Sequence, residues 1–317
     1  MYELPTPDNI LAQRALIDPV FLDSASMRHP ALDEALGCRC TLKVETLNPV
    51  RSFKGRGTEA LVASLPSSTR GVIATSSGNF GQALARAALR RGIEATIVCP
   101  SEANPIKVEA MRRLGATVHF TPPDEGEGKA LARKMAAELG LTFIEDGAHL
   151  EIAAGAGTIG QELTEAGHDP DVLVIQVGDG ALAIGVGAWM KAHAPRTRII
   201  GLVASGAPSM ARSLAAGREV DTPSDTIADG MAIDRPVAGV IGLLDQVLDE
   251  VLLVEDASLR RAIRLLMDAA GLLAEPSGAA GVAALMASRE RFAGLDVATV
   301  ITGSNLDPAL HAELVLG

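Results

Sequence analysis

The chain has 317 residues, of which 48% are hydrophobic, and it carries a formal net charge of −11. These values are typical of a soluble α/β protein with a large core and room for two domains. The short basic pairs Arg90-Arg91 and Arg112-Arg113 give no basic face for nucleic acid, and no run of about 18 uncharged apolar residues predicts a membrane span.

Short apolar runs alternate with helical patterns along the chain. The runs are rich in Val and Ile and stop at small or turn-forming residues, which predicts buried strands. The predicted strands are Thr41–Glu45, Gly71–Ala74, Ala95–Val98, Thr117–Phe120, Val172–Val177, Ile199–Val203 and Val297–Ile301. The predicted helices are Phe80–Arg91, Ile106–Leu114, Gly128–Leu139, Thr158–Ala166, Ala257–Ala270 and Ser277–Arg289. This alternation predicts an α/β fold with largely parallel sheets, in which ligands bind beyond the carboxyl ends of strands.

The first candidate for chemistry is a lysine that follows the strand Thr41–Glu45. Lys54 lies within Ser52–Gly57, between a strand end and a predicted helix start. Most lysines are solvated surface cations. Apolar, glycine-lined surroundings are expected to lower the pKa of this amine and make it a nucleophile that forms Schiff bases.

The second candidate is the polar segment Thr75–Gln82, which follows the strand Gly71–Ala74 and opens a helix. Such a turn can cap the helix. It can equally bind an anion, because free backbone amides point outward at a helix start. Spacing alone does not separate these two interpretations.

Two further turns follow strands. The segment Val177–Gly185 contains Gly178 and Gly180, whose surroundings predict backbone amides that wrap a phosphate. A nicotinamide site is set aside, because the third glycine falls two positions late for G-x-G-x-x-G. The segment Thr302–Leu306 is a polar turn after the last predicted strand.

Taken in this order, the four segments resemble the fold-type II pyridoxal-phosphate enzymes, in the branch of threonine dehydratases and serine racemases. The landmarks are S-F-K-x-R-G at Ser52–Gly57, S-S-G-N-x-G-Q-A at Ser76–Ala83, the mid-chain glycine loop and the C-terminal G-x-N turn. Two weaker landmarks, Lys107–Ala116 and Ala274–Gly278, also match. One motif alone is weak evidence, but six motifs in one order are specific.

The resemblance covers roughly residues 40 to 307 and implies a fold. This is the tryptophan synthase beta-like architecture of two lobes, each a parallel sheet flanked by helices. Residues 1–70 and 147–317 are expected to form the large domain, which binds pyridoxal 5′-phosphate. Residues 71–146 are expected to form a small mobile domain that closes over the substrate. The family also implies a homodimer.

The resemblance implies roles for the residues that bind the cofactor. Lys54 binds it covalently and then removes the Cα proton of the substrate, and Phe53 packs against the ring. Asn79 hydrogen-bonds the phenolic oxygen, and Thr302 faces the pyridine nitrogen. The phosphate is held by the backbone amides of Gly178, Asp179, Gly180, Ala181 and Leu182.

The substrate is expected in the second segment. Its carboxylate is received by the loop that contains Ser76, Ser77, Gly78, Asn79 and Gln82. Ser77 also allows a second interpretation, because a hydroxyl opposite Lys54 could exchange a proton on the other face of Cα, as racemisation requires. A helix-capping or carboxylate contact is the alternative role for this hydroxyl. His149 is expected to border the substrate pocket, although a lone histidine is more often structural.

Two features depart from the family pattern or extend it. Asp179 and Ala181 stand where the phosphate loop usually has glycine, and an aspartate beside a phosphate is repulsive unless it points away or pairs with a cation. The segment Thr226–Gly230 matches one that lies near a cation site in related racemases and dehydratases. Asp225 and Asp229 are therefore candidate oxygen ligands for Mg²⁺, Ca²⁺ or K⁺.

The function that these observations predict is that of a lyase. The enzyme would remove the β-hydroxyl of a 3-hydroxy amino acid of the serine, threonine, 3-hydroxyaspartate or phenylserine type and give a 2-oxo acid and ammonia. The alternatives are an amino-acid racemase that uses Lys54 and Ser77, a β-replacement synthase, and a cofactor-binding paralogue without activity. The expected partner is a small amino-acid substrate, with neither nucleic acid nor membrane.

The sparse cysteines and the N-terminal sequence indicate the cytoplasm. The three cysteines are an odd set, which favours reduced thiols. The N-terminus lacks a basic start followed by an apolar stretch, so no secretion signal is expected.

Overall fold

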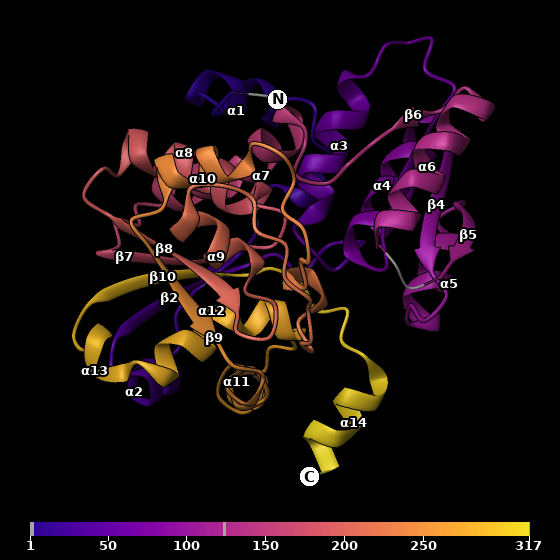
Figure 1. Ribbon diagram of the computed structural model, residues 1–317. Coiled ribbons are helices and arrows are strands. Elements are labelled where there is room, and N and C mark those ends of the chain that lie inside the picture. The colour runs from indigo at the N-terminus through magenta and orange to yellow at the C-terminus, as the bar shows by residue number, and fades with distance from the viewer. Residues whose placement is uncertain (1–2, 123–124, 317) are drawn as a thin grey trace.

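The computed structural model describes residues 3–122 and 125–316, and it contains two separate sheets (Figure 1). The larger sheet has the strand order β1-β2-β10-β7-β8-β9, and the smaller has the order β5-β4-β3-β6. Neighbouring strands are parallel, except that β1 pairs antiparallel with β2 at the edge. The strands are β1 (Ser26–Met27), β2 (Arg39–Val44), β3 (Gly71–Thr75), β4 (Glu94–Pro100), β5 (Thr117–Thr121), β6 (Thr142–Phe143), β7 (Val172–Gln176), β8 (Arg198–Ala204), β9 (Glu250–Val254) and β10 (Asp296–Ile301).

Helices cover the faces of both sheets, as parallel strands require. In Figure 1, α7, α8 and α10 lie on one side of the larger sheet, and α2, α11 and α12 lie on the other. The helices are α1 (Pro7–Arg14), α2 (Pro30–Leu36), α3 (Lys54–Ser64), α4 (Asn79–Arg91), α5 (Pro105–Arg113), α6 (Glu125–Leu139), α7 (Leu150–Glu165), α8 (Ala181–His193), α9 (Ser209–Ala216), α10 (Val240–Val247), α11 (Asp256–Ala270), α12 (Pro276–Ala287), α13 (Arg289–Phe292) and α14 (Pro308–Leu316), with 3₁₀ turns η1 (Pro19–Phe21) and η2 (Asp229–Met231).

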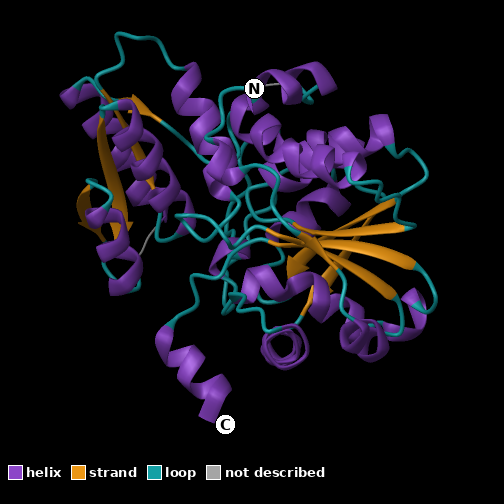
Figure 2. Cartoon of the chain, turned by 180° about the vertical axis from the view of Figure 1, so that it is seen from behind, coloured by secondary structure: helices purple, strands orange, loops and turns teal. Residues whose placement is uncertain are grey.

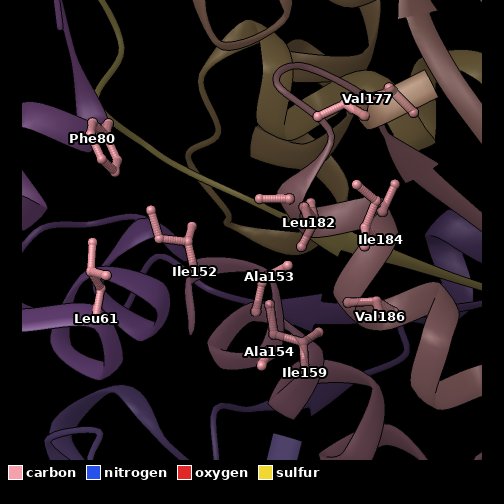
Figure 3. Close-up of a cluster of buried hydrophobic side chains, with 14 of the residues drawn as sticks. Leu61, Phe80, Ile152, Ala153, Ala154, Ile159, Val177, Leu182, Ile184 and Val186 are labelled. Atoms are coloured by element: carbon pink, nitrogen blue, oxygen red, sulfur yellow. The ribbon is translucent and has the colours of Figure 1, made fainter. Parts of the chain in front are cut away.

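The core around the larger sheet consists of separate clusters on its two faces, because successive side chains of a central strand point to opposite faces. In β7, Leu173 and Ile175 join the cluster under α7 and α8, whereas Val172 and Val174 join the cluster under α11 and α12. Figure 3 shows part of the first cluster, where side chains of α7 and α8 meet Leu61 of α3 and Phe80 of α4. Strands that are buried on both faces therefore read as continuous apolar runs in the sequence.

The predicted α/β fold is confirmed. Each of the seven predicted strands is present, as β2, β3, β4, β5, β7, β8 and β10. One predicted helix, Thr158–Ala166, is wrong at its start, because α7 begins at Leu150. Strands β6 and β9, helices α9, α10, α13 and α14, and the elements before residue 39 were not predicted.

The topology brings the carboxyl ends of several strands together. The loops after β2, β3, β7 and β10 all meet in the space between the two sheets, where Figure 2 shows loops converging. The smaller sheet uses strands from residues 71 to 143, which lie inside the predicted small domain. Within the described residues, no helix is both long and apolar enough to span a membrane.

Candidate active site

A cavity of about 310 Å³ lies where these loops meet. All four predicted segments contribute to its lining, with Phe53 and Lys54 from the first and Ser76, Ser77, Gly78 and Asn79 from the second. Residues 178 to 182 supply a third wall, and Thr302 supplies a fourth. The structure thus brings together in one cavity residues that are as far apart in the chain as Phe53 and Thr302. This is the arrangement expected at the carboxyl ends of strands.

Lys54 is the first residue of α3 and is fixed from both sides. The hydroxyl of Ser52 accepts a hydrogen bond from the Lys54 backbone N–H (3.1 Å), and the Thr302 carbonyl accepts one from the Phe53 N–H (2.9 Å). The Lys54 Nζ atom lies 5.0 Å from the centre of the Phe53 ring. The start of α3 is therefore held against the end of β10, and the amine points into the cavity.

The predicted lowering of the Lys54 pKa is wrong. Burial alone lowers the pKa of this ammonium, but the negative charges of Asp146 and Asp179 outweigh burial and raise the pKa above its ordinary value. Asp146 also forms an ion pair with Nζ. The sequence shows the apolar neighbours of Lys54 but not these carboxylates, which come from loops far along the chain.

The segment Ser76–Asn79 divides into capping and lining residues. The Ser76 hydroxyl accepts hydrogen bonds from the N–H groups of Gly78 (3.1 Å) and Gly81 (2.9 Å), so it caps the start of α4. Ser77 lines the cavity. Gln82 is buried in the first turn of α4 and is not among the described residues that line the cavity. Its predicted substrate contact stays a prediction.

Asn79 joins the two sheets across the cavity. Its side-chain amide donates to the carboxylate of Glu275 at the start of α12, and its oxygen accepts from the amide of Asn305 (2.8 Å). An amide has two N–H groups, so one of them is left for the phenolic oxygen of the cofactor. The predicted role of Asn79 is therefore compatible with these contacts, although it is not tested by them.

Glu275 gives the cavity a titrating group that was not predicted. Burial raises the pKa of this carboxyl to about 7, against the attraction of the Lys107 ammonium, which lowers it. The ordinary value is 4.5, so between pH 4.5 and 7 the folded chain keeps a proton that the unfolded chain has lost. The stability contributed by the protonated form is complete below pH 4.5 and is lost as pH rises through 7.

Replacing Glu275 by glutamine should flatten this pH dependence. The free energy of unfolding of the unmodified protein should fall relative to Glu275→Gln by up to about 3 kcal/mol between pH 4.5 and 7.5. Urea unfolding of both proteins across this range measures the difference. Glu94→Gln, at an exposed carboxyl, is the control and should follow the unmodified protein. Parallel curves for Glu275→Gln and the unmodified protein would contradict the assignment.

The glycine loop forms a close cradle between β7 and α8. Gly180 has a φ of +97°, a conformation that side chains other than glycine rarely adopt. At Gly178, an added Cβ would lie 2.2 Å from the Gly230 carbonyl oxygen. The first N–H groups of α8, at Ala181 and Leu182, have no acceptor within the helix and are available to an anion. Asp179 lines the cavity beside them.

The residues present fit pyridoxal phosphate. The cavity offers a lysine, an aromatic ring, a helix N-terminus and a buried hydroxyl at Thr302. Five buried side-chain atoms of its lining residues have no hydrogen-bond partner among the described residues: Asp146 Oδ1, Gln176 Oε1, Asp234 Oδ1, Glu275 Oε2 and Ser277 Oγ. Buried polar atoms are normally paired, so these atoms indicate a polar ligand.

The remaining predicted residues lie at the margin of the cavity or outside it. His149 precedes α7, accepts a hydrogen bond from the Glu145 N–H (3.4 Å), and is not among the described lining residues. Asp229 lines the cavity and pairs with Lys107, whereas Asp225 is exposed and does not line it. In the part of the chain that the structure describes, no group of three or more His, Cys, Asp or Glu side chains could hold a metal ion. The metal site stays a prediction.

Among the described residues that line the cavity, sequence reasoning missed six charged groups: Lys107, Lys129, Glu145, Asp146, Asp234 and Glu275. Lys107 and Glu275 lay inside recognised landmarks, but only as markers of resemblance. Asp146 lies three residues before His149, and in this loop only His149 was predicted to border the pocket. A signal existed for Asp146, because it follows the last strand of the smaller sheet, where ligand-binding residues are expected.

Comparisons with known proteins agree with this geometry. The family model described as "Pyridoxal-phosphate dependent enzyme" matches residues 22–303. The chain is 36% identical to a putative threonine dehydratase of Sinorhizobium fredii, over 90% of this chain and 88% of that protein. It is 32% identical to the L-threo-3-hydroxyaspartate ammonia-lyase of a Pseudomonas species, over 90% of this chain and 91% of that protein.

Other matches differ in length or are more remote. The chain is 34% identical to the biosynthetic L-threonine dehydratase of Haemophilus influenzae over 87% of its own length, but it spans only 55% of that protein. Among solved structures, maize serine racemase superimposes with a TM-score of 0.92 at 26% identity, covering 99% of this chain and 98% of the other.

Proposed function

The chain belongs to the family of pyridoxal-phosphate-dependent enzymes, in the branch of threonine dehydratases and serine racemases, and from this premise we propose that it is a 3-hydroxy-amino-acid dehydratase. Such a lyase releases a 2-oxo acid and ammonia. The observation that carries the proposal is the position of Lys54, whose amine points into a polar cavity at the carboxyl ends of the strands.

The cavity residues have separate tasks in this proposal. Lys54 holds the cofactor and takes the Cα proton, and Phe53 packs on the ring. Asn79 binds the phenolic oxygen, and Thr302 faces the pyridine nitrogen. The amides of residues 178 to 182 bind the phosphate, and the loop Ser76–Asn79 receives the substrate carboxylate. The cofactor, when bound, stabilises negative charge at Cα.

Thr302 favours elimination over transamination. A hydroxyl cannot keep a pyridine nitrogen protonated as a carboxylate would, so the ring withdraws electrons less strongly. Weak withdrawal suits prompt loss of a leaving group from Cβ. The dehydratase names among the relatives support the same reaction, and 3-hydroxyaspartate and threonine are the substrates that those names favour.

Racemisation is the second candidate function. Ser77 lines the same cavity as Lys54, so it is available for proton exchange on the other face of Cα. The structural likeness to a serine racemase supports this alternative. Both reactions begin with removal of the Cα proton, so the two functions are distinguished by identifying the products that form.

Release of 2-oxo acid from a panel of substrates tests the proposal. The protein loaded with cofactor is incubated with the L and D forms of serine, threonine, 3-hydroxyaspartate and phenylserine. We expect at least one L-isomer to give its 2-oxo acid and ammonia in equal amounts. Inversion at Cα without ammonia would establish the racemase instead. If cofactor binds to Lys54 but neither product forms, the dehydratase proposal fails.

Other properties also belong to the proposal. We infer that residues 71–146 move as a small domain against residues 1–70 and 147–317, that the active protein is a homodimer, and that it works in the cytoplasm. A bound Mg²⁺, Ca²⁺ or K⁺ near Asp225 and Asp229 is also part of the proposal, and it would compete with Lys107 for the Asp229 carboxylate.

A further inference from the structure

Asp146 is a carboxylate that the loop between β6 and α7 places at the Lys54 amine. The next residue, Gly147, has a φ of +79°, and an added Cβ there would lie 2.6 Å from the Asp179 carbonyl oxygen. Only glycine fits this turn without strain. The turn packs against the glycine loop and holds the Asp146 side chain in the cavity wall, with only 11% of its surface exposed.

The two oxygens of Asp146 have different surroundings. Oδ2 pairs with the Lys54 Nζ atom. Oδ1 is buried and has no hydrogen-bond partner among the described residues, although its side chain lines the cavity. An unpartnered buried oxygen is costly, so it indicates a donor supplied by a bound molecule. Asp146 can therefore contact the reactive lysine and a ligand at the same time.

The other lysines of the cavity are held differently. Lys107 pairs with Asp229, and Lys129 pairs with Glu145 (3.3 Å). The charges of Asp179 and Glu275 also raise the pKa of Lys54, but Asp146 is the carboxylate that accepts a hydrogen bond from the Lys54 amine. The geometry thus singles out one carboxyl group for direct proton exchange with Lys54.

We propose that Asp146 is a catalytic residue, the acid that protonates the departing β-hydroxyl group. This inference rests on the proposed dehydratase function. It assigns to the protein a proton donor for the leaving group, in a reaction where the phosphate of the cofactor is the other available acid.

In one elimination, Lys54 and Asp146 each gain and lose one proton. The step starts with the proton of the Lys54–Asp146 pair on Asp146, which leaves Lys54 as the free amine. Lys54 then takes the proton from Cα and becomes an ammonium. The electron pair of the Cα–H bond forms the second Cα–Cβ bond while the Cβ–O bond breaks. The departing oxygen keeps the electron pair of that bond and takes the proton of Asp146, so it leaves as water. The ammonium proton of Lys54 then passes to Asp146 and restores both groups.

Substrates that differ only in the leaving group test the acid. Chloride leaves without a proton, whereas hydroxide needs one. For serine the matched pair is L-serine and β-chloro-L-alanine, and the 3-chloro analogue of another preferred substrate serves equally. In Asp146→Asn we expect kcat/KM for the hydroxy substrate to fall by about 10²–10³-fold. The fold-loss of kcat/KM for the chloro substrate should be smaller than the fold-loss for the hydroxy substrate by a factor of at least about ten.

Asp234→Asn is the matched control for the general effect of removing a carboxylate from the cavity. Asp234 also lines the cavity and also has a buried oxygen without a partner among the described residues, but the carboxylate that pairs with Lys54 is that of Asp146. Asp234→Asn should leave the ratio of the two kcat/KM values unchanged. Asp146→Glu keeps an acid in place and should recover part of the activity on the hydroxy substrate.

The pKa of Lys54 gives a readout that does not depend on turnover. In the cofactor-free protein, the pH dependence of labelling at Lys54 by acetic anhydride, followed by peptide mass spectrometry, reports this pKa. The Asp146 charge raises the pKa of Lys54, so Asp146→Asn should lower it, whereas Asp234→Asn should not.

The outcomes separate this inference from the proposed function. Equal losses on both substrates would make Asp146 a structural residue, and no loss on either would leave the phosphate as the acid; each result overturns the inference and keeps the lyase. If the unmodified protein eliminates neither substrate, the proposed function fails. In that case an unchanged Lys54 pKa in Asp146→Asn would also refute the pairing.

Discussion

Replacing Lys54 by alanine should remove the absorbance band of the lysine-bound cofactor and lower turnover by at least about 10³-fold. The Lys54 amine lines the cavity, where it can bind an aldehyde and, in the proposed reaction, take the Cα proton. Its backbone is fixed by Ser52 and Thr302, so the alanine variant should fold with the cavity intact. Absorbance of the loaded protein and 2-oxo acid release are the two measurements.

A second cavity lysine provides the control for Lys54→Ala. Lys129 lines the same cavity but pairs with Glu145 on the side of the smaller sheet. Lys129→Ala should therefore keep the absorbance band. Small primary amines should partly restore turnover to Lys54→Ala, because they can occupy the vacated space beside Asp146. Normal activity in Lys54→Ala would overturn the whole assignment of the site.

The fold was predictable because its signals are local. Buried parallel strands give short apolar runs such as Val172–Val177, and each strand end is marked by a glycine or a polar turn. The four cavity segments could be found for the same reason, since each lies within about ten residues of a strand end. Local patterns therefore identified the candidate segments, and the resemblance to a known family indicated that the four belong to one site.

The start of α7 was not predictable in this way. Gly155 and Gly157 lower helix propensity, so the pattern placed the helix start after them. In the structure, an added Cβ at Gly155 would lie 2.8 Å from the Arg56 carbonyl oxygen, and one at Gly157 would lie 2.9 Å from the Gly185 carbonyl oxygen. The glycines allow α7 to pack closely on α3 and α8, and this tertiary packing outweighs their low propensity.

The electrostatics of the site were also not predictable from local sequence. The ion pair between Lys54 and Asp146 joins positions 92 residues apart, and it reverses the expected shift of the lysine pKa. Asp229 was predicted as a metal ligand from the resemblance of Thr226–Gly230 to a segment near a cation site, and in the structure it pairs with Lys107 from another part of the chain. Charges depend on partners that only the folded chain brings together.

A buried ion network anchors the helix that carries Lys54. Arg56 is fully buried and donates two hydrogen bonds to each of two carboxylates, Glu45 (2.8 and 2.8 Å) and Glu162 (2.6 and 2.9 Å). Lys43 pairs with Glu162 as well (2.6 Å). The network connects α3 to β2 and α7, so it fixes the helix two residues after the reactive lysine.

Replacing Arg56 by methionine should destabilise the protein by about 3–5 kcal/mol, because two buried carboxylates then lose their main partner. The midpoint of urea unfolding measures this change. Arg70→Met is the control, since Arg70 is exposed and its pair with Glu94 spans 3.4 Å, a type of contact worth about 0–1 kcal/mol. A loss in Arg56→Met no larger than the loss in Arg70→Met would contradict the role of the network.

The same variant should change the response to acid. Burial acts to raise the pKa of Glu162, but hydrogen bonds and charge from Arg56 and Lys43 prevail and lower the pKa to about 2 from 4.5. The stability that this carboxylate contributes is therefore present above pH 4.5 and lost as pH falls toward 2. Without Arg56 the pKa of Glu162 rises, so the unfolding free energy of Arg56→Met should fall less steeply between these values. An equally steep fall in both proteins would mean that Arg56 does not hold the Glu162 charge in the folded state.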